Sequence, residues 1–469
     1  MNIVFIQQFL YEWQAPMIFS ALVKARGHAA YMIIDNSCRD AARKALSLQP
    51  DLIVFSNINS GNMEFVYDCA RIIKENCDLK ILVGGVYISL NYSGIHMEHI
   101  DMLGIGEGET MFCALLDTGL QGNRFEKVPG LIFKEGEKIR INQPQCIGEL
   151  DQLPFPDRAI YYTNPLLRKE KVRMFYSGRG CKYNCSYCCV PQLVRINAVV
   201  PPIRKRSPDS LIREILEVDS KWGMKAAFFQ DDTFTQDRQW LEEFLPLYKK
   251  YVDKPFMCMT RARDIAEEKT VELLHACGCI SVGIGIETAN EGSRWVSLNR
   301  KESNATIRNA VSYLRKRNIR ITTFNMIGLP GETLADVYET LDFNHRLKVD
   351  SAWAVFYQPY RKSETDSAKD TLMYGNFYSG LPGDHPDKDK LQLLQRYFPY
   401  IVKHPFLMSF IHYKALKKAS YLFFALHSFS REIYIWHRSF LLTLICGIRN
   451  QLQYKKMTGE HQSDSVKQP

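Results

Sequence analysis

The sequence predicts an α/β protein with two successive modules and a helical C-terminal region. Two observations support this prediction. Short apolar runs alternate with amphipathic segments over the first 120 residues, and a second series of the same kind begins at Val172. Such alternation is typical of parallel sheets covered by helices. The 469 residues suffice for two or three domains.

The first series, over residues 1–120, predicts a doubly wound sheet. Strands are expected at NIVFI (2–6), AYMIID (30–35), DLIVFSN (51–57), KILVGG (80–85) and MLGIG (102–106). Helices are expected at 15–28, 39–48, 64–76 and from about 108 to 116. Ligands of such sheets bind across the carboxyl ends of the strands. Glycines at those ends let the backbone approach a bulky ligand, although each can also be an ordinary turn glycine.

Residues 121–170 are expected to connect the two modules. VPGLIFKEGEKIRIN (128–142) predicts a small hairpin with its turn at residues 135–137. LDQLPFPDR (150–158) is punctuated by prolines, which indicates an extended segment between two domains.

The second series, over residues 171–362, predicts a partial (β/α)6 barrel. Its strands are expected at MFYSGRG (174–180), AAFFQDD (226–232), PFMCMTR (255–261), SVGIGIE (281–287), ITTFNMI (321–327) and SAWAVFYQPY (351–360). Its helices are expected at 208–222, 239–250, 266–276, 305–317 and 335–345. In such barrels the chemistry takes place at the carboxyl ends of the strands.

The C-terminal region (363–454) is expected to be helical, and the polar tail (455–469) to be disordered. Residues 404–450 are aromatic, basic and apolar in patches. They suit either a helical cap over the barrel or an interfacial helix on a membrane. Charged residues at 431, 432 and 438 break the apolar runs, so this segment should not span a membrane. Its apolar character motivates the hypothesis of an apolar substrate.

Composition narrows the class of protein further. The N-terminus lacks the pattern of a secretory signal, and no apolar run reaches 18 residues. Thirteen scattered cysteines indicate reduced thiols and a cytoplasmic location, either free or at the inner face of the membrane. A net charge of +9 is modest for this length and does not predict a nucleic-acid partner.

Three cysteines carry the strongest chemical signal. Cys181, Cys185 and Cys188 lie in SGRGCKYNCSYC, a spacing that can place three thiolates on one face of a cubane iron–sulfur cluster. A cluster held only by protein takes four cysteines, so three leave one iron open to another ligand. The alternatives are a chance grouping and a zinc site, but no fourth Cys or His stands at finger-like spacing. Cys189, Cys277 and Cys279 are interpreted as buried small apolar residues.

With this loop, the chain resembles radical S-adenosylmethionine (SAM) enzymes that carry an N-terminal cobalamin-binding (B12-type) domain. The resemblance covers roughly residues 1–362. In the first module and the connector it is carried by KARGH, QPDLIVFS, KILVGGVYISL, GIGEGE, VPGLIF and LDQLPFPDR. In the second module it is carried by the cysteine loop, KRSPDSLIREI, FFQDDTF, TRARDI, HACGC, VGIGIE and GLPGET.

The resemblance implies roles for residues of the second module. The three loop cysteines would ligate a [4Fe–4S] cluster, whose open iron chelates SAM. One electron from the cluster would then cleave SAM to a 5′-deoxyadenosyl radical. The residues implied to contact SAM are Tyr187 at the adenine, Asp231 at the amino group, Arg261 at the carboxylate, Glu287 at the ribose or amino group, and Gly328 beside the nucleoside.

The resemblance also implies cobalamin at the carboxyl ends of the first sheet. The residues concerned are Ser56, Gly84, Gly85, Gly106 and Glu107. Methionine-synthase-type domains place a cobalt-ligating histidine in the loop after the first strand. Here that loop reads QQFLYEWQAP (7–16) and has no histidine. Cobalamin would therefore be held without a histidine ligand from this loop.

The implied function is methylation of an unactivated carbon of a small molecule, with an electron donor such as flavodoxin or ferredoxin. One alternative is radical oxidation, cyclisation or rearrangement without methyl transfer, as in anaerobic tetrapyrrole cyclases. Another is a non-catalytic iron–sulfur or redox-sensing protein. The SAM-side residues Arg261 and Glu287 and the GLPGET motif argue against the sensor, which would not need them. The sequence indicates neither the substrate nor the oligomeric state.

Overall fold

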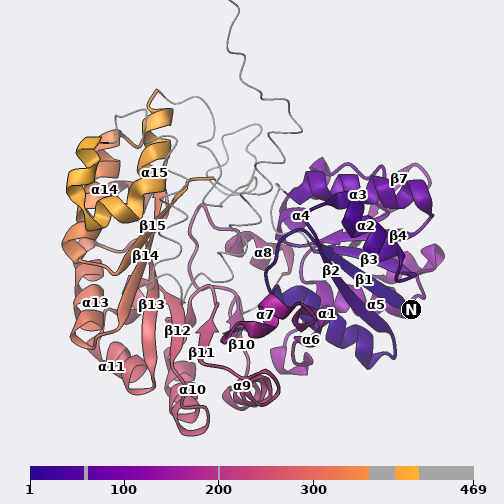
Figure 1. Cartoon of the computed structure of the whole chain (residues 1–469), viewed down its shortest axis with the longest axis horizontal. Coiled ribbons are helices and arrows are strands. Elements are labelled where there is room, and N and C mark those ends of the chain that lie inside the picture. The colour runs from indigo at the N-terminus through magenta and orange to yellow at the C-terminus, as the bar shows by residue number, and fades with distance from the viewer. Residues whose placement is uncertain (57–61, 199–200, 359–385, 411–469) are drawn as a thin grey trace, which may run out of the picture.

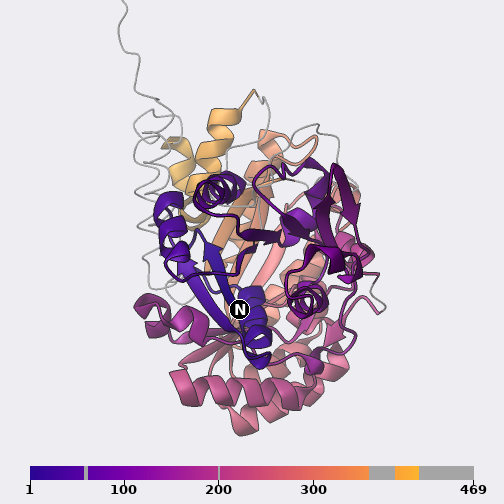
Figure 2. The same ribbon diagram turned by 90° about the vertical axis from the view of Figure 1, so that its right-hand side faces the viewer.

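The computed structural model describes residues 1–56, 62–198, 201–358 and 386–410. Two α/β units lie side by side, with the N-terminal unit against the open side of the second (Figure 1). Turned by 90°, the N-terminal unit stands in front of the strands of the second unit (Figure 2). The expected membrane-facing helix and disordered tail, and most of the expected cap, lie outside the described residues.

The first unit contains a seven-stranded sheet, and five of its strands form the expected doubly wound parallel core. The strand order is β2-β1-β3-β4-β5-β6-β7. The parallel strands are β1 (Asn2–Gln7), β2 (Ala29–Ile34), β3 (Leu52–Ser56), β4 (Lys80–Gly84) and β5 (Met102–Gly104). The helices are α1 (Gln14–Ala25), α2 (Cys38–Leu46), α3 (Met63–Asn76), α4 (Val86–Asn91) and α5 (Gly108–Asp117).

Alternating side chains of the strands bury both faces of this sheet. Ile3 and Phe5 of β1 pack in the cluster formed with α1 and α5, whereas Val4 and Ile6 pack with α2 and α3. Successive side chains of a strand point to opposite faces, so a nearly continuous apolar run is needed when both faces are covered. This explains the run NIVFI.

The hairpin expected in the connector extends the first sheet. Strands β6 (Leu131–Glu135) and β7 (Lys138–Ile141) are antiparallel, and β6 pairs with β5. Their turn contains Gly136 at φ +61°, a conformation that favours glycine. The sheet of the first unit therefore continues to Ile141, past the boundary of residue 120 expected from the sequence.

The second unit contains six parallel strands in chain order, which confirms the partial (β/α)6 barrel. The strands are β8 (Val172–Phe175), β11 (Ala226–Phe229), β12 (Phe256–Thr260), β13 (Cys279–Glu287), β14 (Arg320–Ile327) and β15 (Ser351–Phe356). The covering helices are α9 (Pro208–Trp222), α10 (Arg238–Tyr251), α11 (Glu268–Ala276), α13 (Asn304–Lys316) and α14 (Leu334–Leu347). Strands β8 and β15 are the two edges of this sheet, so the barrel is open in the described structure.

One helix of the C-terminal region is described, α15 (Lys388–Lys403), and it packs beside α14 and β15 (Figure 1). The Nε2 of Gln395 donates a hydrogen bond to the carbonyl of Ala354, at 3.0 Å. The Nδ1 of His345 lies 2.8 Å from the carbonyl oxygen of Val402. Among the described helices, none is long and apolar enough to cross a membrane.

A buried polar cluster joins the connector to both units. Arg158 of the connector donates to the carbonyl of Met174 at 2.7 Å and forms an ion pair with Glu214 of α9 at 3.0 Å. Its guanidinium also lies 3.7 Å from Glu12, in the loop after β1. All three charged side chains are at most 4% exposed. A buried ion pair tolerates little displacement, so this cluster fixes the orientation of the two units.

Candidate active site between the two units

A cavity of about 400 Å3 lies between the carboxyl ends of the two sheets. Its lining includes all five residues that the resemblance connects with cobalamin: Ser56, Gly84, Gly85, Gly106 and Glu107. The barrel contributes Tyr176, Cys189 and Asp232 among others. Residues from the ends of both sheets therefore face one common space.

Three glycines shape the wall of the first unit. A Cβ added at Gly84 would meet only the carbonyl oxygen of Gly104, at 3.7 Å, so the space beyond Gly84 is open. Gly85 and Gly106 adopt φ values of +117° and +77°, which other residues rarely adopt. A Cβ at Gly106 would also lie 2.5 Å from the Oδ1 of Asn197. Gly84 thus leaves room for a ligand, whereas Gly106 permits close contact with the barrel.

The loop after β1 bonds to the barrel. The hydroxyl of Tyr11 donates to the Oε1 of Gln230 at 3.1 Å, and the Nε2 of Gln230 lies 2.8 Å from the same hydroxyl. Burial raises the pKa of Tyr11 to about 12, so this phenol stays protonated at neutral pH. No histidine is among the described residues that line the cavity. The residues present therefore suit a cobalamin held by shape and hydrogen bonds.

Two arginines of the barrel bind the glutamates of GIGEGE. Arg179 pairs with Glu107 at 3.0 Å and with Glu109 at 2.5 Å, and Arg204 pairs with Glu107 as well. Although burial acts to raise it, the pKa of Glu109 is lowered because Arg179 stabilises the carboxylate. Glu107 lines the cavity as expected, but its carboxylate also connects the two units.

The cysteine loop joins a short strand, β9 (Gly178–Arg179), to helix α8 (Val190–Ile196). The amide of Cys188 donates to the carbonyl of Cys185 at 3.1 Å, which closes a tight turn. The amide of Lys182 donates to the Oε1 of Gln236 at 2.9 Å. These bonds hold the three thiols on one loop at the carboxyl ends of the barrel strands.

The donor set of this loop fits a cubane cluster. Each thiolate of a cubane binds a different iron, so the three sulfurs surround a face and do not converge on a point. Among the described residues, no group of three His, Cys, Asp or Glu side chains lies in a position to hold a single metal ion. The Nη1 of Arg261 lies 3.4 Å from the Sγ of Cys185, where a cation would stabilise an anionic cluster.

The other cysteines differ from one another. Cys277 and Cys279 are buried, as expected. Cys189 is only half-buried and lines the cavity, which does not fit the interpretation as a buried apolar residue. It directly precedes α8, so the turn into this helix presents its side chain to the cavity.

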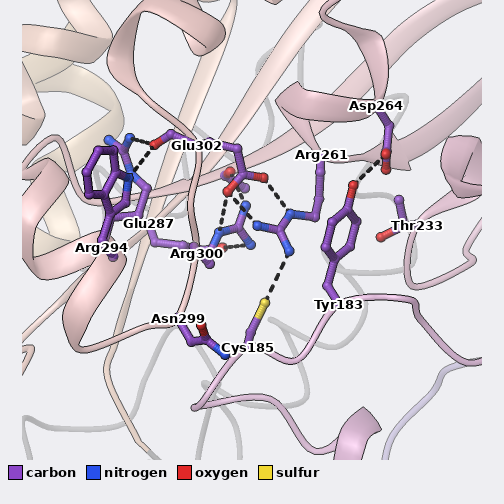
Figure 3. Close-up of polar contacts among 12 residues, drawn as sticks. Tyr183, Cys185, Thr233, Arg261, Asp264, Glu287, Arg294, Asn299, Arg300 and Glu302 are labelled. Atoms are coloured by element: carbon purple, nitrogen blue, oxygen red, sulfur yellow. Dashed lines mark hydrogen bonds and ion pairs between the residues drawn. The ribbon is translucent and has the colours of Figure 1, made fainter.

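Arg261, the residue expected to pair with the SAM carboxylate, is already engaged (Figure 3). Its Nε and Nη2 bind the two carboxylate oxygens of Glu302, each at 2.5 Å. Its guanidinium carbon lies 3.7 Å from the ring centroid of Tyr183. Only the Nη1 edge, beside Cys185, remains for another partner. The two nitrogens with which Arg261 could bind the SAM carboxylate are therefore held by Glu302.

Tyr187 and Glu287, which the sequence suggested separately, meet at the end of β13. The hydroxyl of Tyr187 donates to the Oε1 of Glu287 at 2.9 Å, and the Nη1 of Arg300 lies 3.1 Å from both groups. Glu287 has φ +67°, an uncommon conformation for a residue with a side chain. Such backbone strain is often found at functional sites.

Arg300 and Glu302 were missed by the sequence reasoning. They stand two residues apart in NRKES, between α12 (Glu291–Val296) and α13. In an extended segment, residues i and i+2 point the same way, and this is the signal that could have identified them. A short run of charges is usually a solvated surface, however, and nothing local marks these two side chains as buried.

Of the two aspartates after β11, the structure presents Asp232 to the cavity. Asp231 is buried and accepts hydrogen bonds from the amide of Ser177 at 3.0 Å and from Lys205 at 3.2 Å. The side chain of Asp232 is exposed within the cavity. Although this side chain is open to the cavity, the surrounding protein partly desolvates its carboxylate, and this desolvation together with the neighbouring Asp231 raises the pKa of Asp232 to about 6. Asp231 therefore holds the loop, and Asp232 is the better placed to meet a ligand.

Gly328 begins the turn after β14. It has φ +85°, and its amide donates to the Oε2 of Glu332 at 2.5 Å. Burial raises the pKa of Glu332 to about 7. The GLPGET turn is thus closed by its own carboxylate.

Comparisons with family models agree with this architecture. Residues 13–116 match the B12 binding domain, and residues 175–343 match the radical SAM superfamily. The chain is therefore a radical SAM enzyme with an N-terminal B12-binding domain. A radical SAM domain implies a [4Fe–4S] cluster and SAM, and the B12-binding domain implies cobalamin. The comparisons support an enzyme and do not support the alternative of a non-catalytic iron–sulfur protein.

Two curated methyltransferases are among the relatives. An uncharacterized methyltransferase of Pyrococcus horikoshii is 25% identical over 338 residues, which is 70% of this chain and 71% of that protein. Cytidylyl-2-hydroxyethylphosphonate methyltransferase of Streptomyces wedmorensis is 21% identical, over 65% of this chain and 63% of that protein. Anaerobic magnesium-protoporphyrin IX monomethyl ester cyclase of Synechocystis is 24% identical, over 52% of this chain and 48% of that protein.

Solved structures share the fold. The radical SAM methyltransferase TsrM from Kitasatospora setae, with cobalamin and a [4Fe–4S] cluster bound, superposes with a TM-score of 0.63 at 16% identity, covering 78% of this chain and 74% of that chain. The cobalamin-dependent SAM radical enzyme OxsB with aqua-cobalamin gives 0.65 at 14% identity, covering 98% and 76%. These likenesses confirm the arrangement of the two units.

Proposed function

We propose that this enzyme methylates a carbon atom of a small molecule, with cobalamin as the carrier of the methyl group. The observation that carries this proposal is the shared cavity. The glycine-lined wall of the B12-binding unit and the carboxyl ends of the barrel strands face one space, so two bound cofactors would meet there. The relatedness to two curated methyltransferases supports the same reaction.

In this proposal the chain positions and shields the reacting groups. When bound, the cofactors supply one electron for SAM cleavage and a transferable methyl group. Cys181, Cys185 and Cys188 hold the cluster, and the edge of Arg261 beside Cys185 offsets its negative charge. Asp232 accepts a hydrogen bond or a proton from a ligand in the cavity. The placement of the cavity between the two units limits the access of water to a reactive radical.

The second candidate is a radical oxidation or cyclisation without methyl transfer. It is favoured by the similarity to the magnesium-protoporphyrin ester cyclase, which covers about half of each chain. An apolar substrate stays a hypothesis, because the segment that suggested it lies outside the described residues.

The products of SAM separate the two candidates. Anaerobically reconstituted enzyme is incubated with a reductant, SAM carrying an isotope-labelled methyl group, and a small-molecule extract. Methylation is expected to give 5′-deoxyadenosine, demethylated SAM and labelled product, all detected by mass spectrometry. Cyclisation or oxidation gives 5′-deoxyadenosine without labelled product. A Cys185→Ser variant, which should lack the cluster, gives the background of each product.

A further inference from the structure

We propose that a surface next to the cysteine loop docks an acidic one-electron carrier protein. This docking face consists of the exposed side chains of Lys182, Arg263, Trp295, Val296 and Lys301. The inference concerns how the cluster receives its electron. It therefore goes beyond the proposed methylation and holds for either candidate reaction.

The apolar part of the docking face is the end of α12. Trp295 is 47% exposed and Val296 is 86% exposed, and they are adjacent. The indole Nε1 of Trp295 donates to the carbonyl of Glu302 at 3.3 Å, so the ring is fixed along the loop that follows α12. Fixed, exposed aromatic and aliphatic side chains are typical of the centre of a protein interface.

This surface connects directly to the cysteine loop. The Nδ2 of Asn299 donates to the carbonyl of Asn184 at 2.6 Å, and the Oγ of Ser186 donates to the carbonyl of Ser297 at 2.5 Å. Figure 3 shows Asn299 beside Cys185. Only the hydrogen-bonded segment 297–299 would thus lie between a carrier bound at Trp295 and Val296 and the loop that contains Cys185. Electron transfer between proteins requires such proximity of the two redox centres.

The charge of the docking face selects the carrier. Lys182, Arg263 and Lys301 are exposed there. The carboxylates beneath them are buried and paired, since Asp264 is 5% exposed and binds Lys182, and Glu302 is 2% exposed and binds Arg261. Lys182 shares its charge with Asp264, whereas Arg263 and Lys301 add exposed positive charge. Exposed cations attract an acidic partner and raise the association rate at low salt. Electron-transfer complexes generally use small, weak interfaces.

The redox step balances between the two proteins. The reduced carrier gives up one electron, the cluster takes it up, and no bond is made or broken. Reduced flavodoxin, an acidic protein with a low-potential flavin, is a suitable probe of this chemistry.

The test measures reduction of the cluster in stopped-flow experiments. In the Arg263→Glu/Lys301→Glu double variant, reduction by flavodoxin at low ionic strength is expected to slow by about 10-fold or more. Trp295→Ser should weaken flavodoxin binding, measured by calorimetry, without changing its salt dependence. Dithionite, a small reductant, should reduce all variants at the wild-type rate.

A matched control carries the same change of charge elsewhere. Arg124→Glu/Lys138→Glu lies on exposed positions of the first unit and should leave the flavodoxin rate within about 2-fold of wild type. The proposal would be overturned if flavodoxin reduced the cluster of the docking-face double variant at the wild-type rate. It would also be overturned if the control double variant were slowed as much as the docking-face double variant. Slower reduction by dithionite would also overturn it, because the defect would lie in the cluster. A wild-type dimer that Trp295→Ser dissociates, seen by sedimentation velocity, would assign the face to a second copy instead.

Discussion

Arg261 and Glu302 form a buried bidentate ion pair, with two nitrogen–oxygen distances of 2.5 Å. They come from the end of β12 and from the loop before α13. The pair holds the guanidinium near Tyr183 and Cys185, so Glu302 positions the charge beside the Sγ of Cys185, a proposed cluster ligand. Although burial acts in the opposite direction, Arg261 and Arg300 hold the pKa of Glu302 below its usual value.

Replacing Glu302 with Gln should destabilise the fold. The change leaves Arg261 without its charged partner in a buried site, which costs about 3 kcal/mol of unfolding free energy. Because the folded-state pKa of Glu302 is lowered, the loss should be complete at neutral pH and should shrink as the pH falls through that pKa. Anaerobic urea denaturation measures it. The control is Glu268→Gln, whose surface pair with Lys316 should contribute less than about 1 kcal/mol. Equal stability of Glu302→Gln and wild type would contradict this role.

The cysteine ligands can be tested individually. Cys185→Ser is expected to lose most of the iron and acid-labile sulfide of the reconstituted protein, because a cubane with one thiolate missing is poorly held. Cys189→Ala, one residue beyond the loop ligands, should retain both. Iron and sulfide analysis with anaerobic absorption spectra distinguishes the two. Loss of the cluster in Cys189→Ala would mean that a fourth thiol takes part.

The open space at Gly84 should be required for cobalamin. A Cβ at position 84 would have only one neighbour within 4 Å. The leucine side chain of Gly84→Leu should therefore occupy the cavity without disrupting the fold. We expect cobalamin retention after gel filtration to fall at least about 10-fold, or about 1.4 kcal/mol of binding free energy. Gly122→Leu, at a position with no atom within 4 Å of a Cβ, is the control. Wild-type retention in Gly84→Leu would place the corrin elsewhere.

Asp232 should make stability depend on pH. Its folded-state pKa is raised to about 6 from an ordinary value of 3.8, so the folded protein binds this proton more tightly than the unfolded chain. The charged carboxylate therefore destabilises the fold increasingly as the pH rises from about 4 to about 6. Asp232→Asn should be more stable than wild type above that range and equal to it below. Unfolding free energies at several pH values test this, with the exposed Glu126→Gln as control. A pH-independent difference would contradict the assignment.

The two sheets could be predicted because their signals are local. Apolar strands and amphipathic helices alternate, and inner strands such as β1 and β3 bury both faces in the way their apolar runs require. The membership of β6 and β7 in the first sheet could not be predicted. A hairpin is visible in the sequence, but its pairing with β5 is a tertiary contact that leaves no local pattern.

For the candidate site, too, local features could be predicted from the sequence and tertiary contacts could not. The cysteine loop could be identified because its three proposed ligands lie within eight residues of the sequence. The sequence could not indicate whether Asp231 or Asp232 faces the cavity. Neighbouring residues after a strand point to opposite sides, and tertiary packing decides which of the two sides faces the cavity. Arg300 was missed for a similar reason, since its contacts with Tyr187 bridge 113 positions of the chain.

The ion pairs of Arg179 have a consequence for the evolution of this architecture. Arg179 stands two residues before Cys181, and its guanidinium is held by Glu107 and Glu109 of the other unit. The strand that leads into the cysteine loop is thus anchored in a different domain. A barrel joined to a B12-binding unit that lacks these two glutamates would lose that anchor and leave Arg179 without its carboxylate partners. Recombination between homologous enzymes should therefore conserve both glutamates together with the arginine, so that the two domains are inherited as a pair.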